Sequence, residues 1–490
     1  MSFTFEVKET DLLGRVGEIR VGGRALETPY MFPVIHPVSQ IVPTKDLAAM
    51  GFGGVMTNSY IIYSRLRERA LGSGVHRLVD FDGAVMTDSG GYQVLEYGDL
   101  EVGYRDVADF QSRIGSDLAV TLDRPTGYPQ TRKVAKDTVD YSLGNAKATL
   151  SEFGESRTLW VGPVQGGLYG DLVRRSAKAM VAAGFRFLAL GSPVQVMQSY
   201  MFAELVDMIM SARRAIPYSV PLHLFGAGHP LTMPLAVALG CDTFDSASYV
   251  LFARSGRYMT RSGVLNLQSM RHLPCSCPAC APTSVVELME MEHQERTKAL
   301  SLHNLYVLRE EIEGCKEAIA EGRLWDLVEE RSMAHPRLRD AFARMAKYSR
   351  DLEVGTPAIK DRGLFVRSTL DYARPELSIA RAKLAGAISR ASRTAAVASG
   401  PGGDGGEGAD VYGVHPVLGP YPMELRFQYP LGQTETAEAQ GVPPDAKKAL
   451  KAMGYARVRL PQAEKKKAPR SRRSRRGASP SPRLSSARSR

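Results

Sequence analysis

The stretch AVMTDSGGYQVLEYG, residues 84–98, places an acid and two glycines at the end of an apolar run. Asp88 follows the apolar residues directly, and Gly90 and Gly91 loosen the backbone just after it. A second acid, Asp245, ends another apolar run in DTFDSASY. A carboxyl group held where a buried strand gives way to a loop can move a proton on a substrate. This placement is typical of an active site.

A second group of chemistry-bearing residues is the sequence PCSCPAC, which spaces Cys275, Cys277 and Cys280 as C-x-C-x₂-C. His303 follows in LSLHNLYVLREEIEG, whose pattern predicts a helix. Three thiolates and one imidazole complete a tetrahedral zinc shell with no open position, so we predict one structural zinc ion per chain. The alternatives for the fourth ligand are His272, His293 and Cys315. His303 is favoured because a helix after a Cys-rich loop commonly presents this ligand, whereas Cys315 reads as an ordinary buried thiol.

The elements that must position the acids are short apolar runs alternating with helical patterns over the first 250 residues. Eight runs are predicted to be strands: YMFPVIH (30–36), GVMTNS (54–59), AVMTDSG (84–90), LAVTLDRP (118–125), LWVGPVQGG (159–167), FLALGSP (187–193), PLHLFGAG (221–228) and DTFDSASY (242–249). Two intervals show the spacing of one helix face: Ala135, Val139, Leu143, Ala146 and Leu150 in one, and Phe202, Leu205, Ile209 and Ala212 in the other. Strands alternating with helices pair in parallel, and eight such units predict an α/β fold with a closed (β/α)₈ TIM barrel. The alternative is an open doubly wound sheet, which would leave two edges to protect.

A polar residue stands near the end of every predicted strand. In chain order these residues are His36, Asn58, Asp88, Asp123, Gln165, Ser192, His229 and Asp245. The C-terminal ends of parallel barrel strands open into one mouth, where barrel enzymes carry out their chemistry. For Asn58 and His229 we favour a helix N-cap or a loop hydrogen-bonding role. Three acids and a glutamine converging on this mouth predict that it is the active site.

The bulk composition indicates a cytoplasmic protein of two or three domains. The chain has 490 residues, of which 44% are hydrophobic. It contains no apolar run of roughly twenty residues, which a membrane span needs. Its start, MSFTFEVKETD, lacks the pattern of a secretory signal. Five cysteines in so long a chain do not form a disulfide scaffold.

The positive charge is concentrated at the C-terminus. The net charge is +11, and residues 461–490 hold three Lys, eight Arg and one Glu. This composition predicts a disordered basic tail. Such a tail attracts polyanions by neutralising phosphates without reading sequence, so nucleic acid is an expected partner.

These features together closely resemble the tRNA-guanine transglycosylase family in its archaeal form. The matching stretches, in the family's order, are MTDSGGYQV, LDRPTGYP, VQGG, HLFGAGHP, GCDTFDSASY, and CSCPAC with LHNL. They spread over about the first 310 residues, and their combination is very specific. The segment 414–435, VHPVLGPYPMELRFQYPLGQTE, is similar to part of the C-terminal extension of archaeal members.

The resemblance implies exchange of a base in tRNA without breaking the phosphodiester chain. Asp245 matches the family's nucleophile, which attacks the ribose C1′ and forms a covalent tRNA–enzyme intermediate. Asp88 matches the acid/base that moves protons on the departing and incoming bases. A retaining two-step exchange needs one attacking carboxylate and a second proton-handling group, which agrees with these two roles. The choice of Asp245 as the attacking group rests on the family position alone.

The resemblance assigns seven further residues to a base pocket: Ser89, Tyr92, Asp123, Gln165, Gly191, Ser192 and Phe225. Asp123 and Gln165 would hydrogen-bond the edge of the heterocycle, above the backbone of residues 191–192. Tyr92 would stack on the base and Phe225 would cover its other face, with plain core packing as the alternative for both. The target nucleotide must leave its stack to enter such a pocket.

In archaeal members the incoming base is 7-cyano-7-deazaguanine (preQ0), and the target is the guanine at position 15 in the D-loop of tRNA. This exchange begins archaeosine synthesis, whereas bacterial and eukaryotic relatives act on the wobble guanine. The archaeal substrate is favoured here because LALGSPV differs from the Gly-rich bacterial stretch, and because of the C-terminal extension.

We expect three parts: a barrel with its zinc subdomain near 270–310 (1–345), an α+β extension with a Gly-rich linker (346–460, linker 398–413), and the tail (461–490). Archaeal members usually end in a PUA domain that holds the tRNA acceptor end. The residues after 435 are too few for one, so a separate PUA-like protein or the tail is expected to replace it. A homodimer is also expected.

Two other interpretations stay open. An archaeosine-synthase-like paralogue tends to lose the zinc ligands and the acids, and a non-catalytic tRNA-binding subunit lacks the nucleophile. A generic retaining glycosidase explains neither the zinc cluster nor the tail.

Overall fold

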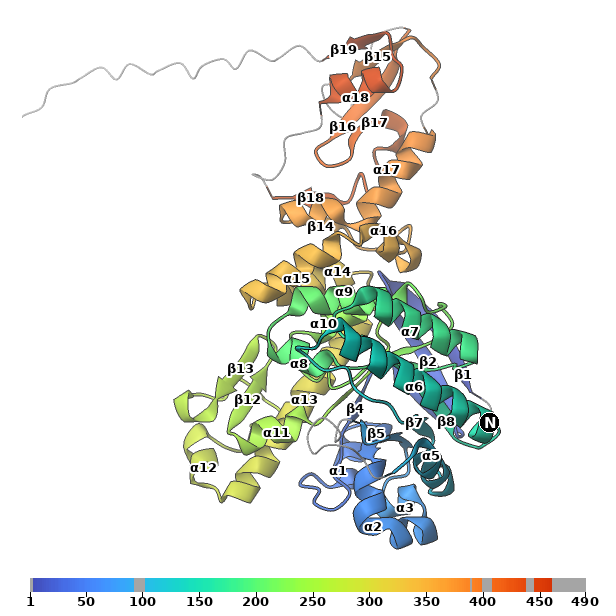
Figure 1. Ribbon diagram of the computed structural model, residues 1–490. Coiled ribbons are helices and arrows are strands. Elements are labelled where there is room, and N and C mark those ends of the chain that lie inside the picture. The colour runs from blue at the N-terminus through green and yellow to red at the C-terminus, as the bar shows by residue number, and fades with distance from the viewer. Residues whose placement is uncertain (1–2, 92–101, 388–389, 399–407, 438–444, 461–490) are drawn as a thin grey trace, which may run out of the picture. The chain divides into compact units, whose positions relative to one another are not determined.

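Eight parallel strands form the centre of the fold in this computed structural model, which describes residues 3–91, 102–387, 390–398, 408–437 and 445–460 (Figure 1). The strands are β4 (Tyr30–Pro33), β5 (Gly54–Asn58), β6 (Ala84–Asp88), β7 (Leu118–Val120), β8 (Leu159–Val164), β9 (Leu188–Leu190), β10 (Leu222–Leu224) and β11 (Thr243–Ser246). They follow the order β4-β11-β10-β9-β8-β7-β6-β5. A parallel bridge between Val34 and Met56 then joins the two ends, and the Ile35 N–H donates to the Met56 carbonyl at 2.8 Å. The predicted TIM barrel is confirmed, with each strand inside one of the eight predicted runs.

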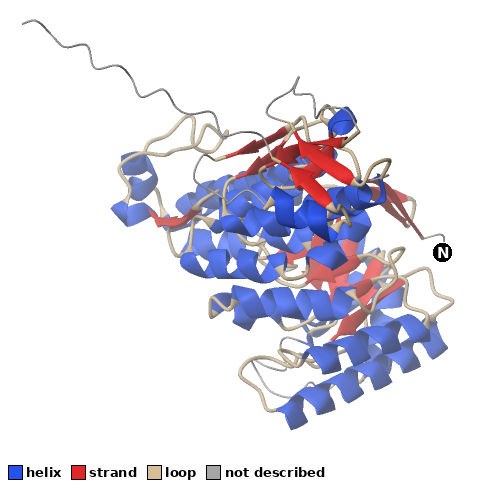
Figure 2. Cartoon of the chain, turned by 90° about the horizontal axis from the view of Figure 1, so that it is seen from above, coloured by secondary structure: helices blue, strands red, loops and turns tan. Residues whose placement is uncertain are grey.

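The strands are apolar because helices cover the outside of the sheet while side chains fill its inside. In β6 the first four residues are buried and only Asp88, at the C-terminal end, is partly exposed. Helices (blue) lie beside the strands (red) in Figure 2. Successive helices contact one another in the order α2 (Ser59–Ser73), α5 (Tyr104–Arg113), α6 (Arg132–Phe153), α7 (Gly170–Ala183) and α9 (Phe202–Arg213). Polar side chains are therefore placed at the strand ends.

Two helices of the barrel, α6 and α9, cover the two intervals whose apolar spacing predicted a helix. The helices of the barrel are α1 (Thr44–Ala49), α2 (Ser59–Ser73), α3 (Val75–Val79), α5 (Tyr104–Arg113), α6 (Arg132–Phe153), α7 (Gly170–Ala183), α8 (Pro193–Gln198), α9 (Phe202–Arg213), α10 (Met233–Ala238) and α11 (Ser248–Arg254). Helix α6 begins where the Thr131 side chain accepts a hydrogen bond from the Val134 N–H. Its buried face contains four of the five predicted residues, and Leu150 is half-buried. All four predicted residues of α9 are buried.

An antiparallel sheet at the N-terminus is absent from the sequence-based expectations. It consists of β1 (Thr4–Asp11), β2 (Gly14–Val21) and β3 (Arg24–Thr28), paired in that order. Strand β2 packs against α10 and the long helix α13 (His293–Ala320). The outer strand β1 has no fully buried residue before Asp11, so its hydrophobic signal is weak.

A hairpin and two helices follow the last barrel unit. The hairpin joins β12 (Arg257–Thr260) to β13 (Gly263–Asn266), and α12 (Val285–Glu290) precedes α13. This segment has a small core of its own, formed by residues such as Tyr258, Leu267 and Leu288. It carries the cysteine cluster.

Two helices, α14 (Leu324–Ser332) and α15 (Pro336–Ala346), follow α13 within the part predicted as 1–345. The residues after them form both helices and strands, as predicted for the α+β extension. They include α16 (Ser349–Leu352) and α17 (Pro375–Ala387), with β14 (Leu364–Val366) paired to β18 (Thr434–Thr436). The structure divides into two compact units, one made of 1–387 and 427–442, the other of 388–426 and 443–490. In its described residues the second unit has a sheet of order β17-β16-β15-β19, one α-helix, α18 (Ala446–Ala452), and a short 3-10 helix, Met423–Leu425. These strands are β15 (Thr394–Val397), β16 (Asp410–His415), β17 (Gly419–Pro422) and β19 (Arg457–Arg459).

Two sequence-based expectations fall partly or wholly outside the described residues. Of the predicted linker 398–413, residues 399–407 are outside them, and 410–413 belong to β16. The predicted tail, 461–490, is entirely outside them. Within the described part, every helix is too short or too polar to cross a membrane.

Candidate active site

One cavity of about 1180 Å³ collects the side chains at the ends of the barrel strands. All eight predicted strand-end residues line it: His36, Asn58, Asp88, Asp123, Gln165, Ser192, His229 and Asp245. They come from positions spread over some 200 residues of sequence and meet because parallel strands end on one side of the barrel. The barrel mouth is therefore a single site.

Asp88 is held at the end of β6 by the neighbouring strand. Asn58, its register partner on β5, donates from Nδ2 to Asp88 Oδ2 at 3.0 Å. Asn58 also caps α2, because its Oδ1 accepts from the Ile61 N–H at 2.9 Å. The capping role expected for Asn58 is confirmed, and its contact with the acid is an additional finding. Burial raises the pKa of Asp88 to about 7, and the charges of Asp123 and Asp245 act in the same direction.

Among the described residues, the hydrogen bonds to Asp245 end on one of its two oxygens. Its Oδ1 accepts from the Gly226 N–H at 2.8 Å and lies 3.0 Å from His223 Nε2. Gly226 has a φ of 62°, a left-handed conformation that favours glycine. His223 is a buried residue that the sequence analysis did not single out. In the sequence, the sign of this residue is a single histidine between two leucines in the predicted strand, LHL.

Asp123 and Gln165 form a hydrogen-bonded pair on the cavity wall. Gln165 Nε2 donates to Asp123 Oδ2 at 2.6 Å, and Gln165 Oε1 accepts from Ser192 Oγ at 2.9 Å. Burial raises the pKa of Asp123 to about 6, although the hydrogen bonds from Gln165 and Ser89 lower it. A Cβ at position 191 would lie 2.7 Å from the Gln165 side-chain carbon Cδ, so Gly191 leaves the room that this amide occupies. The pair presents one carboxyl and one amide to a ligand.

The other predicted pocket residues differ in their positions. Gly191 and Ser192 line the cavity. Phe225 lines it too and is partly exposed, with its ring centroid 4.9 Å from that of His223. Ser89 is fully buried, and its Oγ donates a hydrogen bond to Asp123 Oδ1 at 3.4 Å. It therefore helps to hold the Asp123 carboxylate in place. Tyr92 lies outside the described residues.

His229 has the loop role that the sequence suggested. Its Nδ1 accepts a hydrogen bond from the Leu231 N–H at 3.3 Å, which holds the loop after β10. Burial lowers its pKa to about 4, so the ring is neutral at physiological pH. A neutral ring can accept this hydrogen bond.

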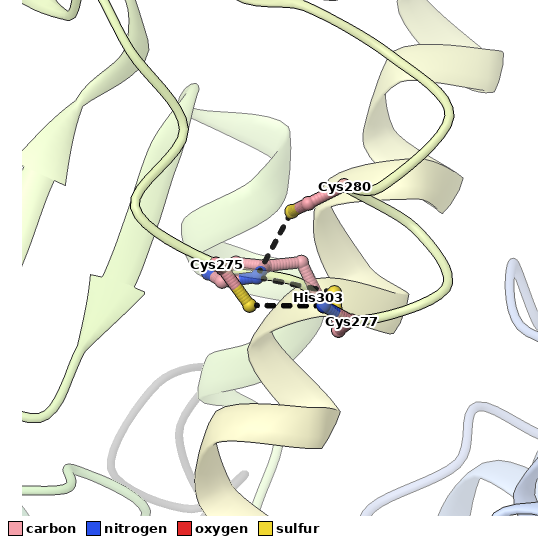
Figure 3. A group of neighbouring side chains, drawn as sticks. All are labelled: Cys275, Cys277, Cys280 and His303. Carbon is pink, nitrogen blue, oxygen red and sulfur yellow. Dashed lines mark hydrogen bonds between the residues drawn. The ribbon is translucent and has the colours of Figure 1, made fainter.

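The four predicted metal ligands come together in the segment after the barrel. Cys275, Cys277, Cys280 and His303 place their ligand atoms within 4.8 Å of one another (Figure 3). His303 Nδ1 lies 3.6 Å from Cys277 Sγ and 3.3 Å from Cys280 Sγ. Among the alternatives, Cys315 is fully buried in the main core, and His272 and His293 are exposed. His303 is therefore the fourth member of the cluster.

The surroundings of His303 suit a metal ligand. Its Nε2 lies 2.8 Å from the Met259 carbonyl, which can accept the Nε2 proton and leave the Nδ1 lone pair toward the thiols. The ring stacks on Tyr258 at 3.6 Å with an interplanar angle of 17°. Three sulfurs and one nitrogen fill a tetrahedral shell, so these residues fit a structural metal ion without an open position.

Comparison with known proteins agrees with this arrangement. Residues 10–337 match the model of the family described as queuine tRNA-ribosyltransferase. The chain is 46% identical over 376 residues to the tRNA-guanine(15) transglycosylase of Aeropyrum pernix, covering 76% of this chain and 72% of that protein. The protein of the same name from Thermococcus onnurineus is 40% identical over 440 residues, covering 89% and 72%. That from Sulfolobus acidocaldarius is 38% identical over 443 residues, covering 88% of each chain.

Proposed function

The chain belongs to the queuine tRNA-ribosyltransferase family of tRNA-guanine transglycosylases, and on that premise we propose that it replaces guanine 15 of tRNA with 7-cyano-7-deazaguanine. The position is that in the names of its relatives from three archaea, to which it is 38% to 46% identical. The incoming base is the one that the archaeal form of the family implies. Replacement at this position is the first tRNA step toward archaeosine.

The reaction begins with attack of the Asp245 carboxylate on C1′ of the ribose. An ester bond forms between a carboxylate oxygen and C1′, and the bond from C1′ to the guanine nitrogen breaks with its electron pair going to the base. Protonated Asp88 gives its proton to the departing guanine. The phosphodiester chain takes no part, so the tRNA remains intact and attached to the enzyme.

The second step reverses the roles of both acids. Ionised Asp88 takes a proton from the incoming base, whose freed nitrogen attacks C1′, and the Asp245 carboxylate leaves with the electron pair of the ester bond. Two displacements at C1′ retain the configuration of the sugar. Asp88 suits both directions because its pKa of about 7 lets it hold or release a proton near neutrality.

The base is recognised by the Asp123–Gln165 pair above the backbone of Gly191. The carboxylate can accept from donor groups on a guanine-like edge, and the amide of Gln165 can donate to its carbonyl. Phe225 offers an apolar surface beside this edge. In this proposal a zinc ion held by the Cys₃His cluster stabilises the segment after the barrel and takes no part in the chemistry.

Asp88 and Asp245, which are far apart in the sequence, line one cavity together with the Asp123–Gln165 pair. This arrangement is the main support for the proposal. The basic segment 461–490 is suited to contact tRNA phosphates.

The test is incubation of the full chain with unmodified tRNA transcript and radiolabelled guanine. We expect label to enter the tRNA and to be chased out by 7-cyano-7-deazaguanine. A transcript with adenine at position 15 should take up no label. Asp245→Asn should abolish incorporation, whereas the exposed, matched control Asp137→Asn should retain it. Incorporation at another guanine would refute the position, and no exchange on any tRNA would refute the enzyme.

A further inference from the structure

His223 is the middle residue of the three-residue barrel strand β10, and it is fully buried. Its Nε2 lies 3.0 Å from Asp245 Oδ1, and its Nδ1 lies 2.9 Å from Thr243 Oγ1. Phe32 and Phe225 lie on either side, with ring centroids 6.2 Å and 4.9 Å away. An apolar side chain could fill this space without the free-energy cost of burying a polar ring. The two polar contacts therefore explain why an imidazole stands here.

The strand register fixes this geometry. His223 on β10 pairs directly with Thr243 on β11, and Asp245 is two residues further along β11. Residues two apart on a strand point to the same face, so Thr243 and Asp245 both face His223. The imidazole thus bridges a hydroxyl and a carboxylate from one neighbouring strand.

The acceptors decide which ring nitrogen carries the proton. An ionised carboxylate can only accept hydrogen bonds, so the contact with Asp245 requires a proton on Nε2. With that proton on Nε2, Nδ1 can accept from the Thr243 hydroxyl. This orientation makes His223 a donor to Asp245 rather than a base that removes a proton from it.

We propose that His223 is a positioning residue for the nucleophile, an inference that rests on the proposed function. Together with the Gly226 N–H it holds Oδ1 of Asp245 and thereby reserves Oδ2 for attack on C1′. Within the described part of the chain, both hydrogen bonds to this carboxylate end on Oδ1. In the second step the ester bond breaks and negative charge returns to the carboxylate. The same two N–H groups stabilise that charge by hydrogen bonding, which favours departure of the carboxylate.

The test separates the hydrogen bond from the shape of the ring. The amide of glutamine reaches the position of Nε2, whereas the shorter amide of asparagine reaches only that of Nδ1. We expect His223→Asn to lower kcat for guanine exchange by about tenfold or more, since a hydrogen bond to a charged group is lost. The KM for tRNA should change by less than about twofold, because Oδ1 does not bind tRNA. His223→Gln should recover most of the lost kcat, and the exposed His293→Asn serves as the matched control.

Each other outcome contradicts the proposal. Equal losses in the Asn and Gln variants, with melting temperatures like that of the wild type, would mean that ring packing is what matters. Unchanged kcat in both would mean that Asp245 needs no support from His223. If either variant fails to fold, Thr243→Val supplies the test, because it removes only the partner of Nδ1. It should lower kcat several-fold at constant KM, and an unchanged kcat would overturn the proposal.

A measurement without turnover keeps this inference separate from the proposed function. In the wild-type protein labelled with ¹⁵N-histidine, the resonances of His223 are assigned by their absence from the His223→Gln spectrum. We expect the proton on Nε2, and a ring protonated only on Nδ1 would refute the donor role. This result holds whether or not the protein exchanges a base.

Discussion

Two acids of the cavity, Asp88 and Asp123, keep their protons to a higher pH than exposed acids do. Burial raises the pKa of Asp88 to about 7 and that of Asp123 to about 6. For Asp88 the charges of two neighbouring acids add to the effect of burial, since a second negative charge nearby disfavours ionisation. At the scale of the residue, this shift suits Asp88 to its proposed role as a proton carrier near neutral pH.

The two steps of the exchange should depend on pH in opposite directions. In the proposed mechanism guanine removal uses protonated Asp88, so its rate is expected to fall as the pH rises through about 7. Attack by the incoming base uses ionised Asp88 and should accelerate over the same range. Single-turnover measurements, first without and then with incoming base, separate the two. Asp88→Asn should be slow and lose both inflections; if the inflections persist, another group is titrating.

The shifted pKa should also be visible in stability. The folded-state pKa of Asp88 lies above its usual value of 3.8, so ionisation opposes folding. This penalty is absent below about pH 4 and complete above about pH 7. Asp88→Asn should therefore raise the melting temperature at pH 8 and leave it nearly unchanged at pH 4. An equal change at both values would point to packing instead of charge.

At the scale of the element, we expect the segment between β12 and the start of α13 to depend on its cysteine cluster. Its own core is small, and the cluster residues Cys275, Cys277 and Cys280 pack against or within it. A small core of this kind is typically supplemented by a bound metal. The barrel, by contrast, has a large continuous core that does not include the cluster.

Loss of the metal should unfold residues 257–293 and leave the barrel folded, together with the part of α13 that is packed into its core. Cys280→Ser is expected to lower the zinc content well below one ion per chain and to make residues 257–293 sensitive to protease. The measurements are elemental analysis and limited proteolysis of the purified protein. Cys315→Ala is the matched control, because that thiol is buried in the main core, and it should retain zinc. Full zinc content in Cys280→Ser would refute the ligand assignment.

At the scale of the molecule, a buried ionic cluster joins the first strand to the extension. Lys360 Nζ donates to Asp11 at 2.8 Å and to Glu376 at 2.6 Å, and all three side chains are almost completely buried. Burial would raise the pKa of Glu376, but the charges of Arg374 and Lys360 hold it below the usual value. Arg374 also pairs with Asp326 of α14 at 3.0 Å. Residues far apart in the sequence are thus tied together by charge within the unit that contains the barrel.

Removing the lysine should be costly because two carboxylates would stay buried without it. We expect Lys360→Met to lower the free energy of unfolding by about 3–5 kcal/mol. Denaturant titration of the full chain measures the change, and the exposed Lys383→Met provides the comparison. A loss below about 1 kcal/mol would mean that the two acids bind protons or water at little cost.

The sequence by itself determined the barrel, the strand-end residues and the metal cluster. These follow from local patterns: short apolar runs, helical spacing, and four ligands of which three lie within six residues. Asp88, Asp123, Gln165 and Asp245 were identified because each ends its own strand. The N-terminal sheet was missed, and part of the burial of its middle strand β2 comes from helices α10 and α13, which lie far along the chain.

Only the tertiary structure decided how these residues act on one another. The contacts of Asn58 with Asp88, of Gln165 with Asp123, and of His223 with Asp245 each join neighbouring strands. Such contacts depend on the strand register and on burial, which no single segment encodes. The same holds for the pKa of Asp88, because desolvation and the charges of two distant acids produce it. The stretch from 84 to 98 could therefore supply the acid, but the rest of the barrel sets the pH at which that acid works.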